Sequence, residues 1–564
     1  MTQPDVTLRS ALPSTLFAYL SVPRNLAFIA AVAVVIAAHA VVFFSTIFIS
    51  PLGFDEAFIL QAPLNLVQGN GYSTEDWDWR NAGENLQFDA IVSTGPLVLM
   101  PVALSFLLFG VSIASARIVM LPFTLILTGS LFVLGRRIGG RWVGLVSALS
   151  VLALNTRADW PTTVIFGPSD VLGEYAAAAM IALALVLLPR HRMAAGLVLG
   201  LATLAKFIAF MAVPAFMLAL LLVPAVASSG WRGRLRELVG FVAAVIVPSI
   251  VWELVKFLSL GPVAYGESLL GYARFVFRSG SGVDGSGRVF FVERLSRMFA
   301  AWHVPTVVAI ALGAALIVLA LVGIRYYFPA RFSDSWKTAS GPIKGVWARF
   351  LAAARLVPIE IWAAAATLGA FTVWWSFIAS STFIRHTMPV MLVAVPILVA
   401  LALRGCIGLW RGESSAGRAH ALTRAVAAVG IASILGVTLL QVALTVKQSF
   451  GTQEWTRTQQ QETADFVRNL GIDQVQGFGW WASPEVRFLS GVASAPLGTG
   501  SGPLVISPIL RELDPANYDV ARGFCEETLY ENEGFVVCTV SPDVAPVYLL
   551  LDPRRVEEPE VVEK

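Results

Sequence analysis

Two adjacent carboxylates, Asp55 and Glu56, directly follow the first long apolar segment of the chain. Only 14% of the residues are charged, so an acidic pair at the edge of an apolar segment is unusual. A carboxylate that faces a cavity at a membrane boundary can act as a general base toward a hydroxyl group. Asp55 can instead cap the helix expected to follow it, with Glu56 favourable near the positive end of that helix. We take Asp55 as the candidate base and Glu56 as the neighbouring catalytic candidate.

The elements that must position this pair are predicted to be membrane helices. Hydrophobic residues make up 56% of the chain, and apolar runs of about 20 residues, long enough to cross ~30 Å of hydrocarbon, occur throughout it. This composition excludes a soluble enzyme, because an ordinary soluble domain carries roughly 25% charged residues. The net charge of +3 comes from arginines spread through short loops, which excludes a nucleic-acid partner.

The arginines also indicate how many runs cross the membrane. The candidate spans are about 26–48, 91–110, 114–134, 142–156, 171–189, 193–207, 209–226, 238–258, 304–324, 358–378, 388–404 and 424–446. The first is longer than a signal-peptide core, and we interpret it as a retained span. If all twelve crossed with the N-terminus inside, the arginine-rich loops at 136–141, 190–192 and 232–236 would face outward, against the positive-inside rule. Treating 91–110, which Pro96 and Pro101 interrupt, as an interfacial or re-entrant helix reverses these loops. The sequence therefore predicts about eleven spans.

This topology divides the chain into three parts. We expect a cytoplasmic N-terminus at 1–24, a transmembrane module at 25–446 and an extracytoplasmic C-terminal domain at 447–564. Within the module, the outer loops are 49–113, with the acidic pair and surface helices, and the flexible Gly/Ser-rich 259–303.

The C-terminal domain has the pattern of a small α/β domain. A helical pattern precedes short alternating runs such as Phe535–Val540 and Val547–Leu551. Cys525 and Cys538 lie close together in this part of the chain and can pair if it faces an oxidising compartment.

Several short motifs occur in a fixed order along the predicted membrane module. They are the Asp55-Glu56 pair, the turn Gly69-Asn70-Gly71-Tyr72, the segment Ser93-Thr94-Gly95-Pro96-Leu97 and the late motif Arg385-His386-Thr387-Met388-Pro389. In this order they resemble the type-C (GT-C) membrane glycosyltransferases over about residues 25–450. Within that superfamily, the chain is most similar to the protein O-mannosyltransferase and aminoarabinose (lipid A) transferase group.

The resemblance implies both a fold and a reaction. The expected fold is a polytopic α-helical membrane protein with surface helices and a small extracytoplasmic α/β domain. The implied reaction is an inverting sugar transfer from a polyprenyl-phosphate-linked donor to an acceptor hydroxyl on the periplasmic face of the inner (plasma) membrane, with Asp55 as base. Phosphate is a good leaving group, so one base suffices and no cofactor is required. The expected partners are this donor, a lipid, glycan or protein acceptor, and membrane lipids.

The departing phosphate of the implied donor needs a positive charge. Arg385 is the best candidate, because a guanidinium can bind phosphate oxygens bidentately and this one lies in a short outer loop at about 379–387. The alternative is an interfacial arginine that extends toward lipid headgroups. Weaker candidates for the same role are His386, Arg80 and Arg274.

The chain departs from the aminoarabinose-transferase pattern at one point. Those enzymes have a lysine before a Pro-Pro-Leu sequence, whereas here the segment reads Thr94-Gly95-Pro96-Leu97. A phosphate contact is therefore missing or moved.

Further polar residues near the expected outer face are candidates for binding the substrate sugar. They are Asp159, Asp170, Glu174 and Tyr72. Turn and capping roles are the alternative for Asp159 and Asp170. The acid-x-acid pattern Asp76-Trp77-Asp78 leaves a divalent metal open, although so short a match is weak.

Two other functions fit a chain of this kind. A lipid or sugar transporter or flippase would bind without reacting, and Lys206 and Glu253 are the few charged residues expected near mid-membrane. Such folds usually have repeated halves, which this sequence does not obviously show. Within the enzyme interpretation, an oligosaccharyltransferase or a polymerase-type GT-C enzyme is the nearest competitor.

Overall fold

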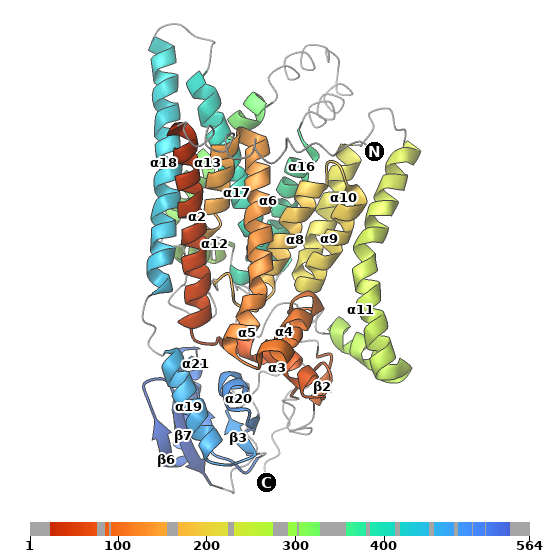
Figure 1. The fold of residues 1–564 in the computed structure, drawn as a ribbon, viewed down its shortest axis with the longest axis vertical. Helices are drawn as coiled ribbons and strands as arrows, with labels where there is room; N and C mark the ends of the chain where they lie inside the picture. The colour runs from red at the N-terminus through yellow and green to blue at the C-terminus, as the bar shows by residue number, and fades with distance from the viewer. Residues whose placement is uncertain are drawn as a thin grey trace, which may run out of the picture.

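The fold combines a bundle of apolar helices with a small lobe that contains a β-sheet (Figure 1). The structure is a computed structural model of the chain. It describes residues 23–75, 85–89, 92–154, 167–223, 231–274, 291–301, 304–327, 357–378, 384–411, 418–450, 456–478, 483–498, 500–513 and 515–541.

Long helices form most of the bundle. Among the described residues, six helices are long and apolar enough to cross a membrane: Pro23–Phe48, Ile113–Gly139, Trp231–Ala273, Thr306–Tyr326, Arg385–Arg411 and Ala421–Ser449. They correspond to α2 (Pro23–Phe48), α5 and α6 (Ile113–Arg117 and Leu121–Gly139), α11 (Trp231–Arg274), α13 (Thr306–Tyr327), α17 (Met388–Arg411) and α18 (Arg418–Ser449).

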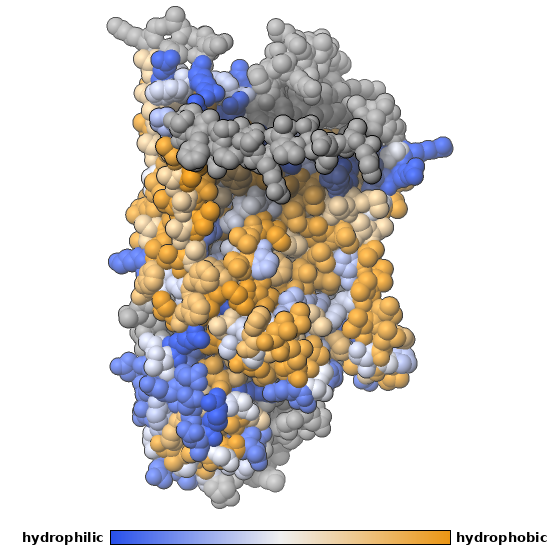
Figure 2. Space-filling model, viewed as in Figure 1, coloured by the Kyte–Doolittle hydropathy of each residue, from blue (hydrophilic) through white to orange (hydrophobic). Residues whose placement is uncertain are grey.

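Shorter helices complete the bundle. They are α7 (Arg141–Leu149), α8 (Glu174–Leu187), α9 (Arg192–Ala205), α10 (Ala212–Leu222), α12 (Phe291–Ala301) and α16 (Ile359–Val373). Each of the eleven expected spans therefore contains a helix, while the number that cross a membrane stays a prediction. Figure 2 shows an orange, apolar band across the visible face of the bundle and blue, polar patches above and below it, as expected for a membrane protein.

The arginines of the predicted inner loops gather at one end of the bundle. Arg141 donates a hydrogen bond to Asn25 near the start of α2, Arg137 lies 3.9 Å from Glu360 at the start of α16, and Arg192 pairs with Glu237 near the start of α11. The other end of α2 contacts the C-terminal lobe. The basic loops and the lobe therefore lie at opposite ends of the bundle, as the sequence predicts.

Two surface helices lie between the bundle and the lobe (Figure 1): α3 (Phe54–Val67) and α4 (Pro96–Phe109). Of the apolar run predicted at 91–110, only the 14 residues of α4 are helical. A helix of this length is about 21 Å long, too short to cross ~30 Å of hydrocarbon. Its side chains Leu104, Leu107 and Phe109 are exposed. This geometry supports an interfacial helix. A short hairpin follows α3, with β1 at Ser73–Glu75 and β2 at Asn85–Gln87.

The C-terminal lobe, residues 456–541, has the predicted α/β character. Its five-stranded sheet has the order β4-β3-β5-β7-β6, with β3 parallel to β4 and β5, and β7 antiparallel to β5 and β6. The elements are α19 (Arg457–Asn469), β3 (Gln474–Gly477), α20 (Pro484–Ser490), β4 (Ala493–Pro496), β5 (Leu504–Ile506), α21 (Pro508–Leu513), α22 (Pro515–Gly523), β6 (Cys525–Glu531) and β7 (Val536–Val540).

A disulfide joins two strands of the lobe. The cysteines whose pairing the sequence left open, Cys525 and Cys538, are bonded to each other and link β6 to β7. The predicted run Phe535–Val540 contains β7, whereas Val547–Leu551 lies outside the described residues.

The opposite placement of the basic loops and the lobe predicts a labelling pattern. In intact cells, a membrane-impermeant thiol reagent should react with Glu462→Cys in the lobe on one side of the membrane, and with Arg136→Cys only from the other side. All three native cysteines are buried or paired, so background labelling should be low. Arg232→Cys is the control and should behave like Arg136→Cys. Equal labelling of all three variants from one side would reject this arrangement.

Candidate active site

The acidic pair lies in the first turn of α3. The N-cap of this helix is Gly53, and no side chain makes a capping hydrogen bond there. Asp55 therefore does not cap the helix, and the capping alternative is wrong. Asp55 and Glu56 are successive helical residues, about 100° apart around the helix axis, so their side chains point to different surroundings.

Asp55 faces the late motif of the chain. Its carboxylate forms an ion pair and a hydrogen bond with the guanidinium of Arg385. Arg385 lies in the short 3-10 helix Ile384–Thr387 that leads into α17. The Arg385 side chain is 14% exposed, whereas that of Asp55 is 40% exposed. The structure thus brings together the predicted base and the predicted phosphate ligand, and leaves the carboxylate accessible.

Glu56 points into the protein and is fully paired. Its two carboxylate oxygens accept hydrogen bonds from Nε and Nη2 of Arg117 at 3.0 and 2.6 Å. The backbone N–H of Val171 adds a third at 3.1 Å. The side chains of Glu56 and Arg117 are each 1% exposed. A carboxylate engaged in this way is not available to take a proton from a substrate, so the geometry argues for a structural rather than a catalytic Glu56.

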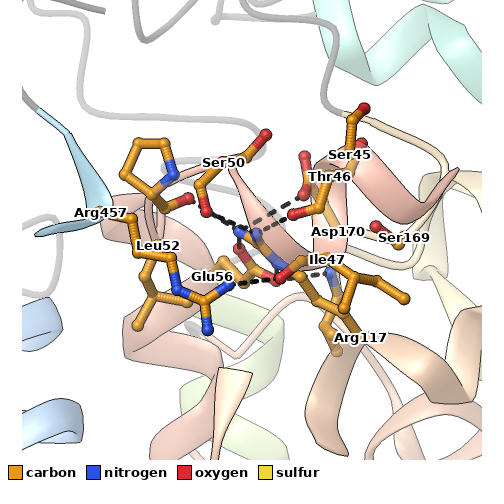
Figure 3. Close-up of polar contacts among 12 residues, drawn as sticks. Ser45, Thr46, Ile47, Ser50, Leu52, Glu56, Arg117, Ser169, Asp170 and Arg457 are labelled. Atoms are coloured by element: carbon orange, nitrogen blue, oxygen red, sulfur yellow. Dashed lines mark hydrogen bonds and ion pairs between the residues drawn. The ribbon is translucent and has the colours of Figure 1, made fainter. Parts of the chain in front are cut away.

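Arg117 also donates hydrogen bonds to backbone carbonyls at the end of the first span, α2 (Figure 3). Its Nη1 donates to the carbonyls of Thr46 and Ser50, and its Nη2 to that of Pro51. These groups lie where α2 ends, so most have no partner within the helix. Asp170, a predicted sugar contact, lies 3.5 Å from the same guanidinium and is 7% exposed. The structure therefore places Asp170 with this buried cluster and not with Asp55.

A second ion pair joins Lys206 to Glu174. The Lys206 Nζ lies 3.0 Å from Glu174 Oε1 and donates to Ser93 Oγ and the Leu172 carbonyl, both at 2.9 Å. The side chains of Lys206 and Glu174 are each less than a tenth exposed. Charges on Arg385 and Asp55 are close enough to act on Lys206. The cluster Asp55, Arg385, Glu174 and Lys206 is the candidate active site.

Close backbone contacts hold Lys206 in this position. The Thr94 segment forms an antiparallel bridge with Lys206, and Gly95 N–H donates to the Ala205 carbonyl at 3.0 Å. A Cβ on Gly95 would lie 2.1 Å from the Leu204 carbonyl oxygen, so only glycine fits. The segment Thr94–Leu97 lacks the lysine found in aminoarabinose transferases. It packs directly against Lys206, a lysine from a different part of the chain.

Two other residues predicted from the sequence, His386 and Tyr72, are not part of the ion pairs described above. His386 lies within electrostatic reach of Arg385 and Lys206. Tyr72 is buried against Phe88 and Trp252, with ring centroids 5.5 and 5.3 Å away, and this burial raises the pKa of its hydroxyl. The structure thus places Tyr72 in an aromatic cluster.

Three further predicted residues lie outside the described ranges or at their edge. Arg80 and Asp159 lie outside the described residues, and Arg274 is described only as the last residue of α11. The pattern Asp76-Trp77-Asp78 is also outside them. Within the described ranges, no group of three or more histidine, cysteine or acidic side chains is arranged to hold a metal.

Sequence reasoning missed the roles of Arg117 and Lys206. Both are charged residues beside long apolar runs, and such residues are costly unless they are paired or functional. That cost is the signal that identifies them. The missing lysine before Pro96 is a second signal for Lys206, because it directs attention to cations elsewhere in the chain.

Comparisons with known proteins agree with this architecture. Residues 93–252 match the family model for dolichyl-phosphate-mannose-protein mannosyltransferase. ArnT from Cupriavidus metallidurans in the apo state is 16% identical, with a TM-score of 0.51 over 91% of this chain and 98% of that one. ArnT bound to undecaprenyl phosphate gives 16% identity and a TM-score of 0.51 over 90% and 97%. The apo oligosaccharyltransferase of Archaeoglobus fulgidus is 10% identical, with a TM-score of 0.46 over 92% and 75%. No curated protein matches the sequence.

These findings confirm the resemblance to the type-C glycosyltransferases that the motifs predict. The fold is similar to that of ArnT. In this chain a bundle of apolar helices is followed by a small sheet-containing lobe.

The buried pair predicts a large loss of stability when one partner is removed. Glu56→Ala should lower the free energy of unfolding by about 3–5 kcal/mol, because it leaves the Arg117 charge buried and unpaired. Asp465→Ala is the control, since its ion pair with Arg468 is about half exposed and should contribute under ~1 kcal/mol. Thermal unfolding in detergent measures both. Similar small losses for the two variants would contradict the structural role of Glu56.

Proposed function

We propose that this protein is an integral-membrane glycosyltransferase that moves a sugar from a polyprenyl-phosphate-linked donor to an acceptor hydroxyl. One observation carries the proposal: an accessible carboxylate, Asp55, is paired with a mostly buried guanidinium, Arg385. A base beside a phosphate-binding cation is what transfer from a sugar phosphate requires. The fold shared with ArnT, which has been crystallised with undecaprenyl phosphate, supports the same class of donor.

In the proposed reaction, the donor phosphate binds Arg385 and replaces its contact with Asp55. The freed Asp55 carboxylate takes the proton from the acceptor hydroxyl as the hydroxyl oxygen forms a bond to the anomeric carbon. The bond between that carbon and the phosphate oxygen breaks, and its electron pair stays on the departing polyprenyl phosphate. Attack opposite the leaving group inverts the anomeric configuration.

Lys206 is the second cation of the proposed site. It stabilises the charge that develops on the phosphate, because its ammonium is buried where water cannot screen it. Glu174 keeps the pair neutral before the donor binds. Lys206 thus supplies the phosphate contact that the segment Thr94–Leu97 lacks.

The orientation of the site follows from two features of the fold. The lobe carries the disulfide Cys525–Cys538, and disulfides persist in oxidising compartments. The arginine-rich loops lie at the opposite end of the bundle, where the positive-inside rule places the cytoplasm. Both features support a site and a lobe on the periplasmic face of the inner membrane.

The proposed base predicts the effect of Asp55→Asn. This change keeps the size of the side chain but removes its capacity to accept a proton, so the transfer rate should fall by roughly 10²–10⁴. Binding of undecaprenyl phosphate should be retained, because Arg385 is still present. Transfer from a synthetic undecaprenyl-phosphate-linked sugar and binding of the lipid phosphate are measured side by side. Asp465→Asn, an exposed acid of the lobe, is the control. Near wild-type turnover by Asp55→Asn would remove this residue as the base.

The proposed phosphate contact predicts graded effects at Arg385. Arg385→Lys keeps the charge and loses the bidentate fork, whereas Arg385→Ala loses both. The alanine variant should bind undecaprenyl phosphate more weakly by on the order of 2–5 kcal/mol, with the lysine variant in between. Lys206→Met should weaken binding in the same direction. If Arg385 only extends toward headgroups, lysine should replace it with little loss. Equal affinities in wild type and both Arg385 variants would reject the contact.

A further inference from the structure

The backbone that leads into Asp55 is hydrogen-bonded to side chains from distant parts of the chain. Helix α2 ends at Phe48 and α3 begins at Phe54, so residues 49–53 join two helices at the membrane edge. The last carbonyls of a helix have no partner within it, and in a water-poor setting other groups must donate to them. Arg117 supplies donors from within the membrane module. Further donors come from the C-terminal lobe, more than 400 residues further along the chain.

Gln460 of α19 makes two hydrogen bonds with one residue of this connection. Its Nε2 donates to the Leu52 carbonyl and its Oε1 accepts from the Leu52 N–H, each at 2.8 Å. Gln460 and Leu52 are both 0% exposed. A buried side-chain amide that pairs with both backbone groups of a residue fixes the orientation of that residue. Leu52 lies three positions before Asp55.

Arg457, one helical turn earlier on α19, makes the neighbouring contact. Its guanidinium donates to the Ile47 carbonyl near the end of α2, and Figure 3 shows it beside Leu52 and the Arg117 cluster. The start of α19 is itself well defined. Thr456 and Gln459 form a capping box there, which sets the position of the first turn and hence of Arg457 and Gln460.

The disulfide-linked hairpin also contacts α19. Asn532, in the turn between β6 and β7, donates to the Gln459 carbonyl at 3.2 Å and to Thr463 Oγ1 at 3.1 Å. The position of α19 is thus set by the covalently closed part of the lobe.

A second contact from the lobe reaches α3 beyond Asp55. Arg487 of α20 donates to Gln61 Oε1 at 3.0 Å, and the ring of Phe488 lies 6.0 Å from that of Phe106 on α4. The lobe therefore contacts the segment that carries Asp55 on both sides of this residue.

We propose that the C-terminal lobe is a positioning element of the active site, in which Gln460 and Arg457 set the place of Asp55 relative to Arg385. This inference rests on the proposed function of Asp55 as the base. Gln460 touches no substrate and acts through the Leu52 backbone. An error of about 1 Å in the position of a catalytic group can cost on the order of 100-fold in rate.

The test compares two adjacent glutamines in the full-length protein. Gln460→Met keeps most of the side-chain volume and removes both hydrogen bonds to Leu52. Gln461→Met is the matched control, because Gln461 is exposed and contacts only its helical neighbour Asp465 among the described hydrogen bonds. The first readout is hydrogen exchange of the peptide covering residues 49–56. We expect exchange in Gln460→Met on the order of tenfold faster than in the wild type, and no change in Gln461→Met.

The second readout is transfer from a synthetic undecaprenyl-phosphate-linked sugar that the wild type uses. Gln460→Met should lower kcat by about 10- to 100-fold and change KM by less than about twofold. Arg457→Gln should act in the same direction and serves as the second variant if Gln460→Met does not fold. Thermal unfolding normalises activity to folded protein.

Two results would overturn the inference: unchanged exchange at residues 49–56, or faster exchange with wild-type kcat per folded molecule. A wild type that transfers no sugar from such donors, together with faster exchange in Gln460→Met, would reject the proposed function while leaving the contact between the lobe and Leu52 intact.

Discussion

The buried ion pair between Arg117 and Glu56 is the contact on which the rest of the site depends. Each charge is 1% exposed, so each requires its partner. Because Glu56 directly follows Asp55, pairing Glu56 with Arg117 inside the protein leaves Asp55 turned toward Arg385. The same guanidinium binds carbonyls at the end of α2. One arginine therefore joins the first span, the surface helix α3 and the turn at Asp170.

The candidate active site itself contains two further ion pairs. Asp55 with Arg385 and Glu174 with Lys206 make two cation–carboxylate pairs, so the site is neutral before a donor binds. In the proposed reaction a phosphodiester with one negative charge becomes a phosphate monoester with two. The proton that Asp55 accepts balances this new charge. The site therefore needs no external charge to complete the reaction, and the two cations remain beside the phosphate throughout.

The lobe extends this arrangement beyond the membrane module. Its helix α19 contributes Gln460 and Arg457 to the connection before Asp55, and α20 contributes Arg487 to α3 after it. The disulfide joins strands β6 and β7 of the same lobe, and Asn532 of the turn between them contacts α19. In the proposed mechanism the lobe supplies no reacting group, and its proposed part is to position Asp55.

Sequence patterns alone predicted the membrane class, the helices, the α/β lobe and the interruption of the run at 91–110, and they singled out Asp55 and Arg385 as candidates. These follow from local features: apolar length, arginine spacing and motif order. The packing of the helices was needed to reveal that Glu56 and Asp170 belong to a buried cluster with Arg117, that Lys206 lies against Thr94, and that Gln460 binds Leu52. These contacts join residues 53 to 408 positions apart. No local pattern encodes such partners, because they depend on how the helices pack.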